Sequence, residues 1–123
     1  MKQVLIIDDA ATVRMYHRQI LEEAGFGVDE AINGIEAIEK ILSKKYELLV
    51  VDVNMPKMNG YAFLQEIRSK AEVYQAPAIM VSTEAEERDR QAALQAGANF
   101  YLVKPTKPGE LSSAARLLTG SAS

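Results

Sequence analysis

The chain of 123 residues contains no cysteine and no tryptophan. Without cysteine it can form no disulfide bond, no thiolate metal site and no cysteine nucleophile, and the absence fits a reducing compartment. No apolar run approaches the roughly 20 residues that a membrane-spanning helix needs. The first apolar run starts directly after Met1-Lys2-Gln3, which leaves no room for a signal peptide. We therefore expect a cytoplasmic protein that does not insert into a membrane.

The chain also lacks an excess of positive charge, since its formal net charge is -3. That balance gives no reason to expect binding to nucleic acid. With 48% hydrophobic and 25% charged residues the composition is that of an ordinary globular protein. No linker, repeat or low-complexity block interrupts the chain. We predict one domain over residues 1–119, a frayed tail over residues 120–123, and a monomer.

Five short apolar runs alternate with five helical patterns. The expected strands cover residues 4–7, 26–31, 47–52, 78–81 and 99–103, and the expected helices cover residues 10–24, 34–45, 60–70, a stretch ending at 96, and one opening at Pro108. Ser82 or Thr83 is expected to cap the fourth helix. This alternation predicts an α/β fold of the (βα)5 type, with a doubly wound parallel sheet of five strands. Right-handed crossovers favour the strand order 2-1-3-4-5.

Three carboxylates follow two strands that are neighbours in this order. Asp8 and Asp9 follow the first strand, and Asp52 ends the third. Ligands bind at this edge of open parallel sheets. Two like charges about 4 Å apart repel by roughly 4 kcal/mol at an effective dielectric near 20, so the cluster needs a neutralising partner. Mg²⁺ prefers such oxygen ligands, and a backbone carbonyl from the loop at Val53-Asn54 could complete its coordination.

Two further features favour phosphate as a ligand. Ser82 ends the fourth strand with Thr83 beside it, and Lys104 ends the fifth strand. Hydroxyls with helix N-terminal amides, and a lysine point charge, can both bind phosphate oxygens. An aspartate in such surroundings can act as a nucleophile and form an acyl phosphate. The pattern thus indicates Mg²⁺-assisted phosphoryl transfer to Asp52.

The chain resembles the receiver domains of two-component response regulators, in particular the small chemotaxis-type, CheY-like members with a flavodoxin-like fold. The matching features span nearly the whole chain and are Asp8-Asp9, Asp52, the loop from Asn54-Met55-Pro56 to Gly60, Ser82-Thr83, and Tyr101 through Lys104-Pro105. The chain departs from many relatives at Thr106, where they carry an apolar residue, and in a short, weakly amphipathic last helix. These departures concern the output surface more than the chemistry.

The resemblance implies a role for each matching residue. Asp52 would be the phosphoacceptor and a metal ligand. Asp9 would bind Mg²⁺ directly, Asp8 would bind it through water, and the backbone carbonyl of Asn54 would be a further ligand. Receiver domains catalyse their own phosphotransfer and autodephosphorylation, so the resemblance implies no separate enzyme activity.

The resemblance also assigns residues that surround the phosphoryl group. Ser82 and Lys104 would bind it, and Ser82 and Tyr101 would move together as the switch. Asn54 and Glu84 match positions that set the rate of phosphate loss. By its sequence alone Tyr101 is better explained as an amphipathic edge residue. His17, on or beside the apolar stripe of the first helix, is more typical of a packed side chain than of a functional one.

The resulting hypothesis is a stand-alone receiver. A sensor histidine kinase or histidine phosphotransfer protein would phosphorylate Asp52, docking on the first helix near Arg14, His17 and Arg18. The signal would leave through the face of the fourth helix, fifth strand and fifth helix, toward an effector that the sequence does not identify. The alternatives are a phosphate sink, an Mg²⁺-dependent phosphohydrolase and a flavodoxin-like cofactor binder. The hydrolase is disfavoured because Asn54 occupies the place of its second acid, and the flavin site because the first loop is acidic.

Overall fold

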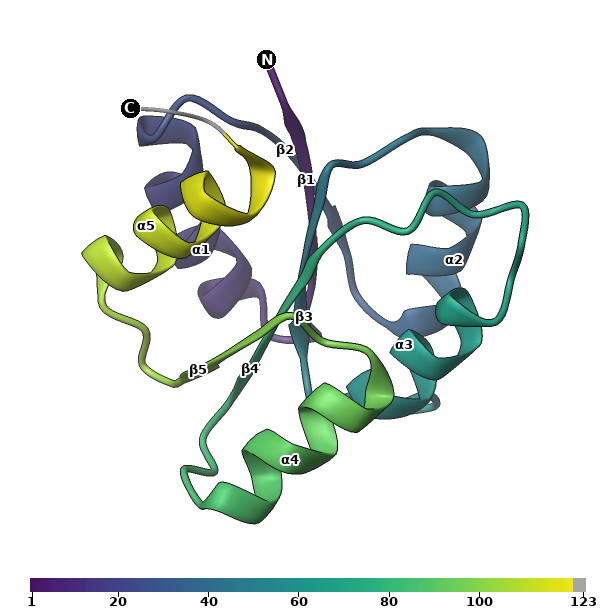
Figure 1. Cartoon of the computed structure of the whole chain (residues 1–123). Helices are drawn as coiled ribbons and strands as arrows, with labels where there is room; N and C mark the ends of the chain where they lie inside the picture. The colour runs from purple at the N-terminus through teal and green to yellow at the C-terminus, as the bar shows by residue number, and fades with distance from the viewer. Residues whose placement is uncertain (121–123) are drawn as a thin grey trace.

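The computed structural model describes residues 1–120 and contains one parallel sheet covered by helices on both faces (Figure 1). The strands are β1 Gln3–Ile7, β2 Gly27–Ala31, β3 Leu48–Asp52, β4 Ala78–Ser82 and β5 Phe100–Val103. The helices are α1 Ala11–Glu23, α2 Gly34–Ser43, α3 Gly60–Arg68, α4 Glu87–Ala96 and α5 Pro108–Thr119. The strand order is β2-β1-β3-β4-β5, with every pair parallel. The predicted fold class and strand order are confirmed.

Alternate residues of the central strands enter two separate cores, because successive side chains of a strand point to opposite faces. Leu5 and Ile7 pack in the core that includes Phe63 and Leu64 of α3. Val4 and Ile6 pack in the second core, which includes side chains of α1 and α5. Figure 1 shows α1 and α5 together on one face, and α2, α3 and α4 on the other. Covering both faces explains why β1, β3 and β4 are nearly unbroken apolar runs.

Most helices begin or end at residues that are typical of helix termini. The Asn33 side chain accepts a hydrogen bond from the Glu36 amide and caps α2, and Asn59 caps α3 in the same way. Pro108 is the first residue of α5, as expected from its fixed φ. Gly97 ends α4 with a φ of 110°, a left-handed conformation that glycine adopts without strain.

The start of α4 differs from its prediction. Neither Ser82 nor Thr83 caps the helix, because α4 begins at Glu87 and its N-cap is Glu86. Glu86 and Asp89 form a reciprocal capping box, in which each side chain accepts from the backbone amide of the other residue. Ser82 belongs to β4, and its Oγ accepts from the Glu84 amide at 3.1 Å. A loop therefore separates β4 from α4.

The apolar spacing along the helices predicts buried positions for Tyr16, Ile35, Leu42 and Leu117, but all four are exposed. On α1 the buried side chains are His17, Ile20 and Leu21, so the face in contact with the core is turned by one residue toward His17. The loop after β5 lies against this end of α1 and contacts Tyr16 and His17, which explains the shift.

None of the helices within residues 1–120 is long and apolar enough to cross a membrane. The predicted frayed tail, residues 120–123, falls mainly on residues 121–123, which lie outside the described residues. Gly120 itself forms the C-cap of α5.

Candidate phosphoryl-transfer site

The three acids predicted to cluster do lie together. Asp8 and Asp9 follow β1, Asp52 ends β3, and the two strands pair so that Ile7 is opposite Val51. Each of the three carboxylates offers an oxygen within 4.8 Å of the others. Asp8 and Asp52 are buried, whereas Asp9 is exposed. The adjacency of strands distant in the sequence thus assembles one acidic site at the carboxyl edge of the sheet.

Lys104 completes this cluster from the end of β5. Its amine lies 3.0 Å from Oδ2 of Asp8 and 2.9 Å from Oδ1 of Asp52. Burial opposes the charge of the amine, but hydrogen bonds with Asp52 and Asp8 outweigh it and raise the pKa of Lys104. The lysine is therefore a permanent cation between the two buried acids.

Burial raises the pKa of Asp52, with the charge of Asp8 adding to the effect and Lys104 opposing it. The side chain of Asp8 is oriented by the Ala10 amide, which donates to its Oδ1 at 2.9 Å. Three carboxylates and one ammonium leave two negative charges uncompensated. A divalent cation matches that excess, and three clustered carboxylate oxygens are the donors that Mg²⁺ prefers. The residues present therefore fit a Mg²⁺ ion.

The glycine at the start of α3 is required by the approach of α3 to this site. A Cβ on Gly60 would overlap the backbone carbonyl of Asp52, and the Gly60 amide donates to the Val53 carbonyl at 2.9 Å. The loop between β3 and α3 therefore returns tightly beneath Asp52, and only glycine leaves enough space.

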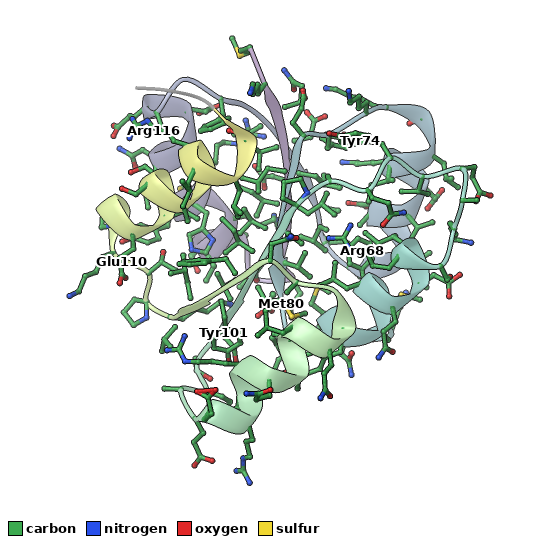
Figure 2. The ribbon with its side chains drawn as sticks, viewed as in Figure 1. Arg68, Tyr74, Met80, Tyr101, Glu110 and Arg116 are labelled. Atoms are coloured by element: carbon green, nitrogen blue, oxygen red, sulfur yellow. The ribbon has the colours of Figure 1, made fainter. Side chains whose placement is uncertain are left out.

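Ser82 and Tyr101 are both linked to the loop between β4 and α4. Ser82 is buried and lies opposite Val103 in the sheet, one residue before Lys104. The hydroxyl of Tyr101 donates to the Glu84 carbonyl at 2.7 Å, and the side chain is only 6% exposed. Figure 2 shows Tyr101 on the side of β5 that faces α4. Tyr101 is thus buried although it belongs to β5, an edge strand of the sheet.

Arg90 of α4 lies over the ring of Tyr101, with its guanidinium carbon 5.3 Å from the ring centre. A cation at this distance is attracted to the face of the ring. The two predicted dephosphorylation residues, Asn54 and Glu84, have exposed side chains in the loops after β3 and β4. A hydrogen bond from the Asn54 amide to Asp52 opposes the rise that burial causes in the pKa of that carboxyl, so the Asn54 backbone lies next to it.

The surroundings of α1 hold residues that sequence reasoning missed or misplaced. Arg14 donates to the Asp8 carbonyl at 2.8 Å and pairs with Glu30 at 2.7 Å, so it supports a residue of the acidic site. Arg18 also pairs with Glu30. His17 is 1% exposed and packs under the loop after β5, which confirms the prediction of a packed side chain and contradicts its place on the docking surface. The spacing of Arg14 and Arg18, one helical turn apart, was the available signal for a shared partner.

Comparison with known proteins identifies the family. The family described as the response regulator receiver domain matches residues 4–116. The chain is 35% identical over 120 residues to the chemotaxis protein CheY1 of Helicobacter pylori, covering 96% of this chain and 97% of that protein. It is 38% identical over 109 residues to the transcriptional regulatory protein ResD of Bacillus subtilis, covering 89% of this chain but only 44% of ResD. The chain thus spans less than half the length of that relative.

A solved structure adds information about the site. The receiver domain of the sensor histidine kinase PA1611 from Pseudomonas aeruginosa PAO1 is described with a magnesium ion coordinated in its active-site cleft. The two proteins share 29% identity and a TM-score of 0.88, with 98% of each chain covered. The profile match, the curated relatives and the shared fold agree with the clustered acids and lysine described above. The chain therefore belongs to the response regulator receiver domain family, the phosphoacceptor domains of two-component signalling.

Proposed function

We propose that this receiver domain accepts a phosphoryl group on Asp52 and signals by contact with another protein. The observation that carries this proposal is the position of the Lys104 amine, 2.9 Å from Asp52 and 3.0 Å from Asp8, beside the third acid Asp9. The arrangement provides a nucleophile, a cation for the phosphoryl oxygens and ligands for a metal.

The reaction is a displacement at phosphorus. A carboxylate oxygen of Asp52 attacks the phosphorus of a phosphohistidine, the P–N bond breaks, and the leaving nitrogen keeps the electron pair. The phosphohistidine ring carries a proton on its other nitrogen, so the products are an acyl phosphate on Asp52 and a neutral histidine ring. Lys104 and the Ser82 hydroxyl bind the transferred oxygens, and catalysis consists mainly of this positioning and charge stabilisation.

Mg²⁺ binding to the acidic cluster is the second part of the proposal. Asp9 and Asp52 would hold the ion directly with the Asn54 carbonyl, and Asp8 would hold it through water. The bound ion supplies charge neutralisation at the transferring group. Support comes from the three clustered carboxylates and from the magnesium described in the PA1611 receiver domain.

The phosphodonor would be a sensor histidine kinase or a histidine phosphotransfer protein, as membership of the family implies. The output would pass through the α4–β5–α5 face, where each element carries an exposed apolar side chain. These side chains are Leu94, Phe100 and Leu117. Ser82 and Tyr101, both connected to the β4–α4 loop, would couple that face to the phosphoryl group. We propose a cytoplasmic monomer.

The phosphoryl group would act by shifting a population of conformations that already exists. Driving the equilibrium from 1:99 to 99:1 requires a preference of about 5.5 kcal/mol for the active form. Contacts of the phosphoryl group with Ser82 and Lys104 are the interactions in the site that can supply this preference. A protein that is captured only by the phosphorylated form would distinguish this function from a phosphate sink, which needs no effector.

The test is incubation with acetyl phosphate, with and without Mg²⁺, followed by intact-mass measurement. We expect a mass gain of one phosphoryl group that requires Mg²⁺ and is absent from Asp52→Asn. A stable gain without Mg²⁺, or an unchanged gain in the variant, would contradict the assignment. Multiple-turnover release of phosphate from small monoesters would instead indicate a phosphohydrolase.

A further inference from the structure

Thr106 is bound twice by helix α1. Its Oγ1 lies 3.0 Å from Nε2 of His17, and its carbonyl accepts a hydrogen bond from the Tyr16 hydroxyl at 2.6 Å. Thr106 is 2% exposed and His17 is 1% exposed, so the bond between their side chains is shielded from water. Two consecutive residues of one helix thus fix both the side chain and the backbone of Thr106.

Lys104 lies two residues earlier in the same loop. Its backbone amide donates to the Ser82 carbonyl at 2.8 Å, which ties it to β4. Its side chain reaches past β4 to Asp8, which follows β1, and to Asp52, which ends β3. The segment from Lys104 to Thr106 is therefore fastened to the sheet at its beginning and to α1 at its end.

One side of the loop faces an open hollow of about 390 Å³, which is lined by Thr12, Val13, Tyr16, His17, Lys104, Pro105 and Thr106. On that side the loop has no other element packed over it, so its hydrogen bonds to α1 hold it in place. The lysine side chain is long and flexible, so the location of its amine depends on a fixed backbone.

We infer that Thr106 is a positioning residue, held by Tyr16 and His17, which fixes the backbone of Lys104 so that its amine lies between the two buried acids. The inference rests on the proposed function, since it assigns Thr106 a part in phosphoryl transfer to Asp52. Thr106 touches neither the phosphoryl group nor the acids and acts only through Lys104.

The unpartnered atom of His17 indicates which way its hydrogen bond runs. Among the described residues, Nδ1 of His17 is the one buried side-chain nitrogen or oxygen without a hydrogen-bond partner. A buried N–H without an acceptor is less tolerable than an acceptor without a donor. His17 is therefore the tautomer that carries its proton on Nε2 and donates to Thr106. Burial lowers the pKa of His17 to about 4, so the ring stays neutral near pH 7.

The test compares two variants with a matched control. Thr106→Val removes the side-chain hydroxyl at constant shape, and Tyr16→Phe removes the bond to the Thr106 carbonyl while the bond between Thr106 and His17 remains. Tyr46→Phe is the control, because it removes a Tyr hydroxyl that donates to Asp29 at the same distance of 2.6 Å, away from Lys104. Thr106→Ser keeps the hydroxyl and should rescue the function.

Two quantities are measured for each protein: the rate of phosphorylation by acetyl phosphate with Mg²⁺, and the NMR relaxation of the Lys104 side chain without metal or phosphate. We expect Thr106→Val and Tyr16→Phe each to slow phosphorylation by about fivefold, the worth of one ordinary hydrogen bond. Lys104 should become more mobile in both variants, whereas Thr106→Ser and Tyr46→Phe should match the wild type.

Unchanged Lys104 relaxation in Thr106→Val and Tyr16→Phe, with rates equal to that of Tyr46→Phe, would overturn the inference. A wild-type protein that takes no phosphoryl group would overturn the proposed function instead. In that case the relaxation of Lys104 still decides whether Thr106 positions it.

Discussion

The amine of Lys104 lies 2.9 Å from Oδ1 of Asp52, although the two residues are 52 positions apart in the chain. This ion pair balances part of the negative charge at the site before phosphorylation. Phosphorylation of Asp52 consumes its carboxylate charge and provides new anionic oxygens nearby, which leaves the lysine free to bind them. One cation can therefore serve both states of the protein.

Replacing this lysine should affect stability and chemistry together. Lys104→Met leaves Asp52 and Asp8 buried without their cation, so we expect a loss of about 2 to 3 kcal/mol in unfolding free energy without Mg²⁺. Saturating Mg²⁺ should restore part of the lost unfolding free energy. Urea denaturation with and without Mg²⁺ measures both values. Lys70→Met, which breaks only a surface pair with Glu66, is the control and should cost less than about 1 kcal/mol.

Metal binding should be visible in thermal unfolding. At a Mg²⁺ concentration one hundred times its Kd, the unfolding free energy should rise by about 2.7 kcal/mol. Asp9→Asn should abolish this gain, and it should stabilise the metal-free protein by about 1 kcal/mol because one of three like charges is removed. Glu72→Gln, which removes an exposed charge on another loop, should show neither effect. A Mg²⁺ response that survives in Asp9→Asn would contradict the assigned ligand.

The buried histidine should make the fold sensitive to acid. Because burial lowers the pKa of His17 from 6.5 to about 4, the unfolded chain binds a proton in this range that the folded chain does not. The contribution of neutral His17 to the unfolding free energy is thus fully present above pH 6.5 and is lost as the pH falls toward 4. When the pH falls from 7 to 5, the unfolding free energy of the wild type should drop by about 2 kcal/mol more than that of the non-titrating variant His17→Gln. Urea denaturation at the two pH values gives the difference, and equal losses would contradict the prediction.

The hydroxyl of Ser82 should matter for the transfer step. Ser82→Ala should slow phosphorylation by acetyl phosphate by about tenfold, as expected for one hydrogen bond to a charged group. Ser82→Thr keeps the hydroxyl and should remain close to the wild type. Ser112→Ala, which removes a hydroxyl on α5, should have no effect on the rate measured by intact mass.

The exposed residues beside the site should set the lifetime of the phosphorylated form. Asn54→Ala and Glu84→Ala should each slow the decay of the acyl phosphate by about fivefold, because each removes a polar group that can orient the attacking water. The rate of formation should stay within about twofold. Following the phosphorylated mass after removal of acetyl phosphate separates the two rates. A change in formation alone would assign these residues another role.

Residues next to one another in the chain were enough to predict the sheet and its acidic edge. The apolar runs before Asp8 and Asp52 indicate buried parallel strands, and strand order follows from the handedness of the crossovers. Parallel strands present their carboxyl ends at one edge, so the approach of Asp8, Asp9, Asp52 and Lys104 follows from the order of the elements. The predicted helix starts at Gly34 and Gly60 are confirmed, and Asn33 and Asn59 cap α2 and α3 there.

Only the tertiary structure decided which side chains meet across different elements, because local sequence patterns do not encode these contacts. The pairing of His17 with Thr106 joins residues 89 positions apart, and it buries a polar side chain on a stripe where Tyr16 was expected. The burial of Tyr101 depends on the course of the β4–α4 loop, whose Glu84 carbonyl accepts its hydroxyl. Ser82 remains part of β4, and a loop after it displaces the start of α4 to Glu87. Periodicity shows which face of a helix is apolar, but the partner across that face is chosen by how the whole chain packs.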